Sequence, residues 1–244
     1  MNVLIIGASS GVGRETAHLF SRKGHNLICA SQDKEELRFL TSDLHIRYGG
    51  EATAVPTDLS DTDSVRKMLK SVYERYDILD CAIVTAGDMP PNQTPYWDEN
   101  SLIHTTATNY IGIALVLNEV SRRMVEQHKG TIICLSSVAG DRGRERNFIY
   151  GASKSALTTY LEGLRMKTFR DGVRVVTIIP GYIDTPMSYG KVSGLLTASP
   201  QYAAKKIFSL LSNKKNVIYI PSVWRYIMFV LKSVPTLIFK RMSF

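Results

Sequence analysis

The amino-acid sequence predicts an α/β fold: one doubly wound parallel sheet of about seven strands, with helices on both faces. Two observations predict it. Short apolar runs alternate with longer segments of helical periodicity, and these runs are hydrophobic almost throughout, as is typical of strands buried on both faces. Repeated alternation of strand and helix also favours parallel strands joined by right-handed crossovers. The predicted strands are residues 3–6, 27–30, 52–56, 79–85, 130–136, 174–179 and 217–220.

The segments between these strands are predicted to be helices. Ser60 to Asp63 supply capping side chains and early negative charge for the third helix. No internal repeat, low-complexity tract or linker separates the elements, so a single domain over residues 1–244 is expected. The predicted helices are residues 13–23, 34–48, 62–75, 101–128, 150–170 and 200–212.

The use of cysteine predicts a reducing environment. Cys29, Cys81 and Cys134 each lie inside an apolar run, and an odd number without C-x-x-C spacing argues against disulfides and a zinc site. We expect buried free thiols, no metal and a cytoplasmic protein. The amino-terminal segment does not resemble a signal peptide, and no stretch of about 18 residues is apolar enough to span a membrane.

The positive charge is concentrated at the carboxyl-terminal end. The chain has 30 basic and 22 acidic residues, a net charge of +8. Nine basic residues and no acidic one follow Asp184, so the whole excess lies in the last quarter. Nucleic acid, anionic lipid or a phosphorylated substrate could each use this charge, and a merely solvated basic face is the alternative.

A glycine-rich turn follows the first predicted strand. Gly7, Gly11 and Gly13 have the spacing G-x-x-x-G-x-G and precede a predicted helix. Glycines permit a tight turn and a close approach of the backbone to a pyrophosphate, which a helix N-terminus attracts. The spacing differs from the general G-x-G-x-x-G fingerprint, and a structural turn is the alternative. The position between strand and helix favours a dinucleotide site.

Tyr150 and Lys154 are four residues apart in a predicted helix, so both can face one cleft. A free tyrosine has a pKa near ~10, but a neighbouring ammonium and a positive nicotinamide favour its phenolate. Ser137, at the end of the fifth strand, could bind a reacting oxygen or only cap the next turn. Asn109 is equally ambiguous, because an amide in a helix can simply satisfy the backbone.

In their order and spacing, these motifs resemble the short-chain dehydrogenase/reductase family, in its compact subgroup, from about Asn2 to Met187. The resemblance implies a Rossmann-type fold and NAD(P)-dependent hydride transfer between a carbonyl and a secondary alcohol. Val84 and Thr85 replace both asparagines of the family's N-N-A-G motif, which puts a side-chain role there in doubt. The cofactor-binding residues it implies are Gly7, Ser9, Ser10, Gly11, Val12, Gly13, Ser31, Gln32, Asp58, Leu59, Ala86, Gly87, Tyr150, Lys154, Pro180, Gly181, Ile183 and Thr185.

The resemblance also implies the catalytic roles. Tyr150 would protonate the carbonyl oxygen, or act as base in the reverse direction, while Ser137 polarises that oxygen. Lys154 would hold the ribose hydroxyls and lower the pKa of Tyr150. Asn109 would link Lys154 to solvent through a water. All four positions are occupied, which argues against the alternative of a non-catalytic NADP-sensing protein.

The end of the second strand bears on the choice between NAD(H) and NADP(H). An acidic residue there usually binds the ribose of NAD. Here Ser31 and Gln32 stand at that place, so no carboxylate repels a 2′-phosphate, and Arg14 and Lys34 could contact it. The sequence therefore favours NADP(H).

Two segments bear on the substrate. Residues 187–200 occupy the family's substrate lid, with a plain surface loop as the alternative. Residues 136–148 resemble the corresponding loop of decaprenylphosphoryl-2-keto-ribose reductases, which points to a keto-sugar or lipid-linked keto-sugar. A soluble ketone or 3-oxoacyl compound is the alternative substrate. We also expect a homodimer or homotetramer.

The carboxyl-terminal tail, about residues 222–244, combines aromatic, aliphatic and basic residues. Such a segment can lie in a membrane interface, and packing against the core or a partner subunit is the alternative. Pro235 divides it into two short pieces, so it is expected to lie on a bilayer without crossing it. It contains no recognised DNA or RNA motif, so no nucleic-acid partner is expected.

Overall fold

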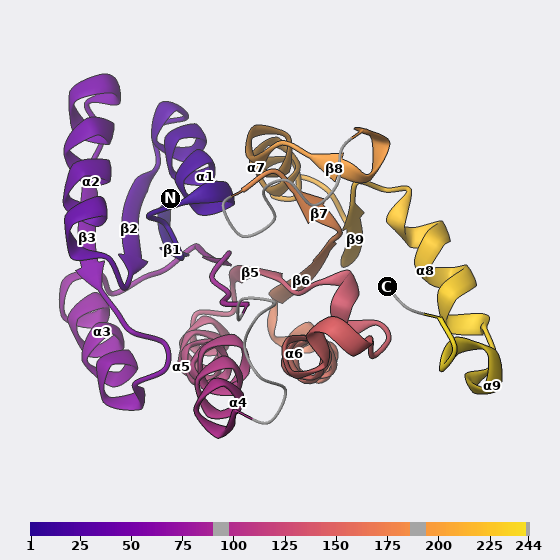
Figure 1. Cartoon of the computed structure of the whole chain (residues 1–244). Helices are drawn as coiled ribbons and strands as arrows, with labels where there is room; N and C mark the ends of the chain where they lie inside the picture. The colour runs from indigo at the N-terminus through magenta and orange to yellow at the C-terminus, as the bar shows by residue number, and fades with distance from the viewer. Residues whose placement is uncertain (90–97, 186–193, 243–244) are drawn as a thin grey trace.

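The computed structural model describes residues 1–89, 98–185 and 194–242, and a parallel sheet of seven strands forms its centre (Figure 1). The strand order is β3-β2-β1-β4-β5-β6-β9, so the chain starts in the middle, builds one half and then returns past β1 to build the other. Sheets of this kind bind ligands where the order reverses, here between β1 and β4. The strands are β1 Asn2–Ile6, β2 Asn26–Ser31, β3 Ala52–Pro56, β4 Cys81–Val84, β5 Gly130–Leu135, β6 Val173–Pro180 and β9 Val217–Ile220, with a separate pair, β7 Tyr182–Ile183 and β8 Thr197–Ala198.

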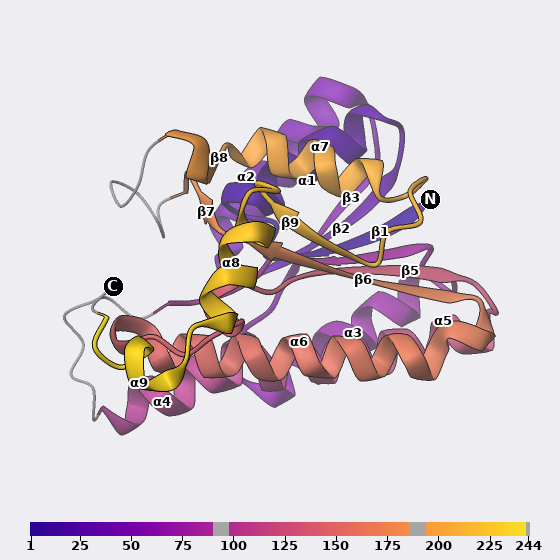
Figure 2. The same ribbon diagram turned by 90° about the vertical axis from the view of Figure 1, so that its right-hand side faces the viewer.

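Helices cover both faces of the sheet (Figure 2). On one face α1, α2 and α7 bury apolar side chains against the strands, and on the other α3, α5 and α6 do the same. The predicted doubly wound fold is therefore confirmed. The bounds of these helices are α1 Gly11–Arg22, α2 Lys34–Tyr48, α3 Thr62–Arg75, α5 Gly112–Glu126, α6 Phe148–Thr168 and α7 Pro200–Ser209.

The expected cap of α3 is present. Asp61 is the N-cap residue, and its carboxylate accepts a hydrogen bond from the backbone N–H of Asp63 at 2.9 Å. Aspartate at this position satisfies a backbone donor that the helix itself leaves unpaired. The local sequence therefore fixes where the third helix begins.

The segment predicted to be helical over residues 101–128 contains one wider turn that the sequence did not indicate. The structure has α4 (Glu99–Thr106), then a π-helical turn at Ala107–Ile111, then α5. Apolar periodicity indicates a helix but does not register one wider turn within it. Such turns are frequent at functional sites, and this one contains Asn109.

The three cysteines are buried and free, as predicted. Burial raises the pKa of the Cys29, Cys81 and Cys134 thiols to about 12. Because the thiolate is the reactive form, these cysteines behave as small core residues at neutral pH.

The carboxyl-terminal tail forms two helices, α8 (Trp224–Ser233) and α9 (Thr236–Phe239), on either side of Pro235, as predicted. The inner side of α8 packs on the domain, where Trp224 and Met228 form a small cluster with Val138 and Ile179. In the described part of the chain, no helix combines the length and the hydropathy that a membrane span requires.

Candidate active site

A cavity of about 490 Å³ lies at the carboxyl ends of the central strands, next to the reversal of strand order. Every cofactor-binding residue that the family resemblance implies lines it, as do the predicted catalytic residues Ser137, Tyr150 and Lys154, whereas Arg14 and Lys34, named as possible phosphate contacts, do not. Asn109 is fully buried and approaches the cavity wall through Gly87. Residues from distant segments meet here because parallel strands end at one edge of the sheet.

The glycine-rich turn between β1 and α1 closes more tightly than other residues would allow. Gly7 has a φ of 84°. A Cβ on Gly13 would lie 1.9 Å from the carbonyl oxygen of Gly7, and a Cβ on Gly7 would lie 2.6 Å from the backbone nitrogen of Ala86. The backbone and the α1 N-terminus are thus open to an anionic ligand, which fits the pyrophosphate of a dinucleotide.

Thr85 has a role that the sequence left in doubt. Its hydroxyl donates toward the carbonyl oxygens of Ile6, at 3.0 Å, and Gly7, at 3.2 Å. The side chain therefore ties the end of β4 to the glycine-rich turn. At this place, where the resembling family has asparagine, threonine supplies the link between the two strands.

The end of β2 carries polar side chains and no carboxylate of its own. The hydroxyl oxygens of Ser9 and Ser31 are 2.6 Å apart. Gln32 donates to the Asp58 carboxylate at 3.0 Å, and that carboxylate also accepts from the backbone and hydroxyl of Ser60 at 2.8 and 2.7 Å. These contacts hold the predicted adenosine-binding residues together.

Arg14 stands next to this group. Its Nε donates to the carbonyl oxygen of Ser9 at 2.9 Å, and its guanidinium pairs with Glu36 of α2. The sequence analysis proposed Arg14 as a phosphate contact. It did not predict the ion pair with Glu36, which forms because α1 and α2 pack side by side. The guanidinium is thus held between the glycine-rich turn and α2.

Ser137 and Tyr150 both line the cavity, and interaction with the Ser137 hydroxyl lowers the pKa of Tyr150. The Ser137 hydroxyl oxygen accepts the backbone N–H of Ala139 at 3.1 Å, so its own hydrogen remains available to another acceptor. Burial raises the pKa of Tyr150 to about 12, and the charge of Asp88 adds to the rise. This direction is opposite to the lowering expected from Lys154, because burial dominates. At neutral pH Tyr150 is therefore a phenol.

Lys154 lies one helical turn from Tyr150, as the spacing predicts, and is only 2% exposed. Its ammonium is 5.9 Å from the Tyr150 ring centre and lies 3.5 Å from the Ala86 carbonyl oxygen and 3.4 Å from that of Leu135. Burial lowers the pKa of Lys154 to about 8. The side chain is thus a buried cation with long, weak hydrogen bonds.

Asn109 holds the loop that follows β4. Its amide oxygen accepts the backbone N–H of Asp88 at 2.9 Å, while its amide nitrogen donates to the carbonyl oxygens of Asp88, at 2.6 Å, and Thr105, at 3.0 Å. A Cβ on Gly87 would lie 3.2 Å from the Asn109 oxygen and 3.1 Å from the Lys154 ammonium. Asn109 therefore positions the segment against which Lys154 packs. Its expected water link to solvent stays a prediction.

Three further residues line the cavity beside Tyr150 and were not singled out from the sequence: Asp88, His104 and Thr108. The Nε2 atom of His104 lies 3.7 Å from the Oδ2 atom of Asp88. Asp88 directly follows the Ala86-Gly87 pair, so its position could have been found, whereas His104 and Thr108 carry no distinguishing signal. Within the described ranges, no group of three histidine, cysteine or acidic side chains could hold a metal ion.

The predicted substrate lid is described only in its second half, because residues 187–193 lie outside the described residues. Gly194–Leu196 form a 3₁₀ turn, and Thr197–Ala198 pair with β7 beside the cavity. The Trp224 indole of α8 donates to the carbonyl oxygen of Leu196 at 2.9 Å. The end of this segment is therefore held by the carboxyl-terminal tail.

Known proteins resemble this chain over most of its length. The family model described as short chain dehydrogenase matches residues 1–194. An uncharacterised oxidoreductase of Listeria monocytogenes is 32% identical over 187 residues, which cover 76% of this chain and 75% of the relative. One from Streptomyces coelicolor is 28% identical over 245 residues, covering 99% and 95%. A solved short-chain dehydrogenase from Sphingobium yanoikuyae in complex with NADPH has a TM-score of 0.82 at 20% identity and covers 96% of both chains.

Proposed function

The chain belongs to the short chain dehydrogenase family of NAD(P)-dependent oxidoreductases, and from this premise we propose that it reduces a carbonyl compound to a secondary alcohol, with Tyr150 as the proton donor. The observation that supports this most is that Ser137, Tyr150 and buried Lys154 line one cavity, which also contains the glycine-rich turn. A nicotinamide cofactor bound along this cavity supplies the hydride.

The two hydroxyl groups would act on the same substrate oxygen. Since Ser137 and Tyr150 line the same cavity and Ser137 is close enough to lower the pKa of Tyr150, one carbonyl oxygen can lie within reach of both. The Ser137 hydroxyl polarises it, and Tyr150 transfers its proton as negative charge develops there. A phenol whose pKa is about 12 holds its proton at neutral pH, which favours the direction of reduction.

Lys154 would act on the phenolate that remains. Lys154 follows Tyr150 by one turn of α6, and its ammonium lies 5.9 Å from the Tyr150 ring centre, so it stabilises the negative charge left after proton transfer. The same ammonium has only weak partners, at 3.4 and 3.5 Å, and can therefore donate to ribose hydroxyls when a cofactor is present. Asn109 maintains this arrangement by fixing the loop at Asp88.

The direct experiment follows NADPH oxidation by the purified protein with a panel of ketones, keto-sugars, lipid-linked keto-sugars and 3-oxoacyl compounds. We propose a keto-sugar or lipid-linked keto-sugar as the substrate class, because polar residues, Asp88, His104 and Thr108, line the cavity beside Tyr150 and suit a hydroxylated substrate. Preferential turnover of simple apolar ketones would contradict this choice without affecting the proposed chemistry.

We propose NADP(H) as the preferred cofactor, in a cytoplasmic homo-oligomer. Ser31, at the end of β2, offers a hydroxyl 2.6 Å from that of Ser9, and Arg14 is held at the Ser9 carbonyl oxygen. A 2′-phosphate would therefore meet hydroxyl groups and a guanidinium at this end of the cavity.

Replacing Ser31 with aspartate should reverse the preference. A carboxylate at this position repels a 2′-phosphate and accepts ribose hydroxyls, and like-charge contacts cost several kcal/mol, so we expect the ratio of NADPH to NADH affinity to fall by about tenfold or more. Fluorescence titration with both cofactors measures it. Ser209→Asp, the same change at an exposed position of α7, is the control. A wild-type protein that prefers NADH would contradict the proposal.

Replacing Asp88 with asparagine should lower the pKa of Tyr150, because the Asp88 carboxylate raises it. In the direction of alcohol oxidation the reaction needs the phenolate, so the rising limb of the pH–rate profile should move to lower pH. The profile of Asp77→Asn, at the opposite edge of the sheet, should coincide with that of the wild type. Coincident profiles for all three proteins would show that Asp88 does not act on Tyr150.

A further inference from the structure

The outer side of the carboxyl-terminal tail exposes large apolar side chains. Tyr226 is 71% exposed, Phe229 75% and Val230 61%, and their spacing places them along one side of α8. On α9, Leu237 is 72% exposed and Ile238 57%. We call these five residues the outer apolar stripe. Isolated apolar residues on a surface are ordinary, but a row over two consecutive helices indicates an interaction site.

The inner side of α8 and α9, opposite the stripe, packs against the domain. The indole of Trp224 packs so closely on Gly181 that a Cβ there would lie 1.9 Å from its nitrogen. Arg142 donates to the carbonyl oxygens of Leu231 and Lys232, and its guanidinium lies 3.8 Å from the Phe239 ring centre. The inner side of both helices is therefore bound to the cavity wall and to the loop after Ser137, and the stripe faces away from them.

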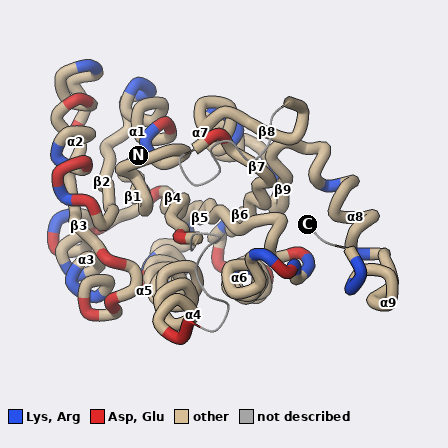
Figure 3. Tube along the Cα trace, in the orientation of Figure 1, with Lys and Arg blue, Asp and Glu red and all other residues tan. Residues whose placement is uncertain are grey.

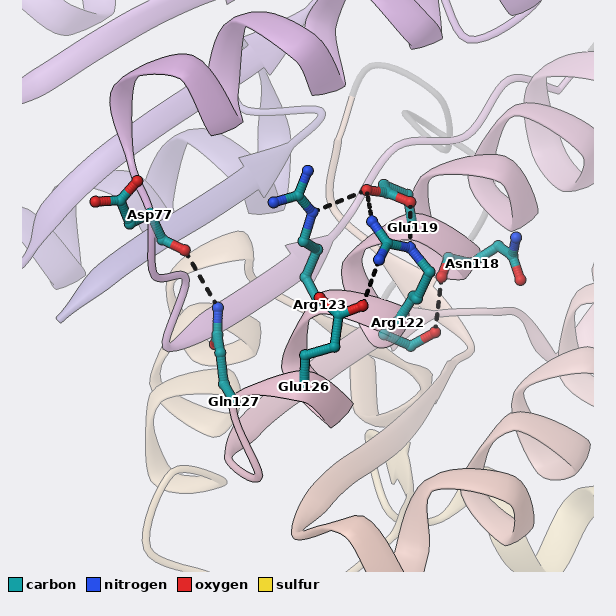
Figure 4. Close-up of polar contacts among 8 residues, drawn as sticks. Asp77, Asn118, Glu119, Arg122, Arg123, Glu126 and Gln127 are labelled. Carbon is teal, nitrogen blue, oxygen red and sulfur yellow. Dashed lines mark hydrogen bonds and ion pairs between the residues drawn. The ribbon is translucent and has the colours of Figure 1, made fainter.

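Charge within the two tail helices has one sign. Arg225, Lys232, Lys240 and Arg241 are exposed beside the stripe, and α8 and α9 contain no acidic residue (Figure 3). The outer surface of α5 is different, because Glu119 pairs with Arg122 and Arg123, and Glu126 pairs with Arg122 (Figure 4). The cations of the tail are thus not neutralised within their own helices.

We propose that the outer apolar stripe docks on the surface of an anionic lipid bilayer. Apolar side chains flanked by cations fit the boundary between acyl chains and anionic headgroups. A second copy of this chain, related by a twofold axis through the stripe, would bring four further cations against the first four and no acidic group from either tail. The bilayer complements this charge, whereas the twofold contact does not.

The two short helices determine how the chain sits on the bilayer. α8 has 10 residues and α9 has 4, with Pro235 between them, so the tail lies along the surface and does not cross it. Each basic residue near an anionic surface strengthens membrane binding by about fivefold. Each large apolar side chain that becomes buried in the bilayer strengthens it by roughly tenfold. Because Trp224 joins α8 to Gly181 of the cavity wall, docking would place the cavity close to the lipid.

Vesicle co-sedimentation of the full chain, with NADPH present, tests this proposal independently of any substrate. We expect binding to vesicles of phosphatidylcholine mixed with phosphatidylglycerol, and much weaker binding to phosphatidylcholine alone. Lys232→Glu/Lys240→Glu should weaken binding by about 25-fold or more, and Phe229→Ser/Val230→Ser by about 100-fold. The matched controls are Lys67→Glu/Lys167→Glu and Phe39→Ser/Ile46→Ser, all exposed positions on other helices, which should bind as the wild type does.

Two results would overturn the proposal. One is equal binding of the wild-type protein to both kinds of vesicle at low salt. The other is a change in oligomeric state, with Phe229→Ser/Val230→Ser monomeric where the wild type is a dimer, which would make the stripe an interface between copies. Bound NADPH and unchanged turnover without vesicles verify that each variant is folded, so loss of lipid binding stays distinct from loss of the reaction.

Discussion

The Tyr150→Phe variant is expected to reduce carbonyl substrates about 10²–10⁴-fold more slowly than the wild type. The change removes only the phenolic hydroxyl and leaves the buried ring in place. NADPH affinity should be nearly unchanged, because the glycine-rich turn does not contact this hydroxyl. Single-turnover NADPH oxidation, together with a binding titration, separates the two quantities.

A matched control for this variant lies on the same helix. Tyr160 donates its hydroxyl to the Ala114 carbonyl oxygen at 3.2 Å, away from the cavity, so Tyr160→Phe makes the same chemical change without touching the site. It should retain the wild-type rate. If Tyr150→Phe also turned over at the wild-type rate, Tyr150 would not be the proton donor.

The Lys154→Met variant is expected to lose activity and gain stability. Loss of the ammonium removes the group that stabilises the phenolate and binds the ribose, so we expect a fall in rate of about 10²-fold or more and weaker NADPH binding. The same ammonium is buried at a cost, since its pKa falls from 10.5 to about 8. This shift corresponds to on the order of 3 kcal/mol at neutral pH. The free energy of unfolding of the variant should rise by up to this amount.

The stability that Lys154→Met gains over the wild type should decrease as the pH rises. Below pH 8 both the folded and the unfolded wild type carry the Lys154 proton, and the full cost of burial applies. As the pH rises from about 8 toward 10.5, the folded state loses the proton first, so the wild type gains stability and the difference from Lys154→Met shrinks. Urea titrations at several pH values measure it. Lys167→Met, at an exposed position of α6, should show neither effect.

The sequence alone predicted the layers of this fold because the information is local. Strands such as Cys81–Val84, buried on both faces, are apolar throughout, and helices between them repeat their apolar residues every three or four positions. Asp61 marks the beginning of α3 through its own carboxylate. Parallel strands then follow from the alternation, and with them the edge at which the site forms.

The geometry around Asn109 could not be predicted in the same way. The π-helical turn at Ala107–Ile111 leaves the apolar pattern unchanged, and the partner of the Asn109 amide is the backbone of Asp88, which any residue would supply. The raised pKa of Tyr150 likewise depends on burial by the assembled site, not on its neighbours in the sequence. The four-residue spacing predicted that Tyr150 and Lys154 share one face of the helix. It could not show whether burial or the neighbouring ammonium would determine the pKa of Tyr150.

Contacts between distant segments were also beyond the sequence. The ion pair of Arg14 with Glu36 joins two helices, and a salt bridge of this kind has no sequence signature. Trp224 belongs to a tail whose composition indicated either a membrane surface or packing against the core. In the structure its two sides differ: Trp224 packs beside Gly181, while Tyr226 and Phe229 are exposed.

Isotope transfer tests the proposed reaction most directly. The protein is incubated with NADPH deuterated at the transferable C4 position and with the substrate identified from the carbonyl panel, and the product is analysed by mass spectrometry and NMR. We predict one deuterium on the carbinol carbon of the wild-type product, and far less product from Tyr150→Phe. If NADPH binds in the cavity and no deuterium reaches any member of the panel, the cavity does not carry out this reaction.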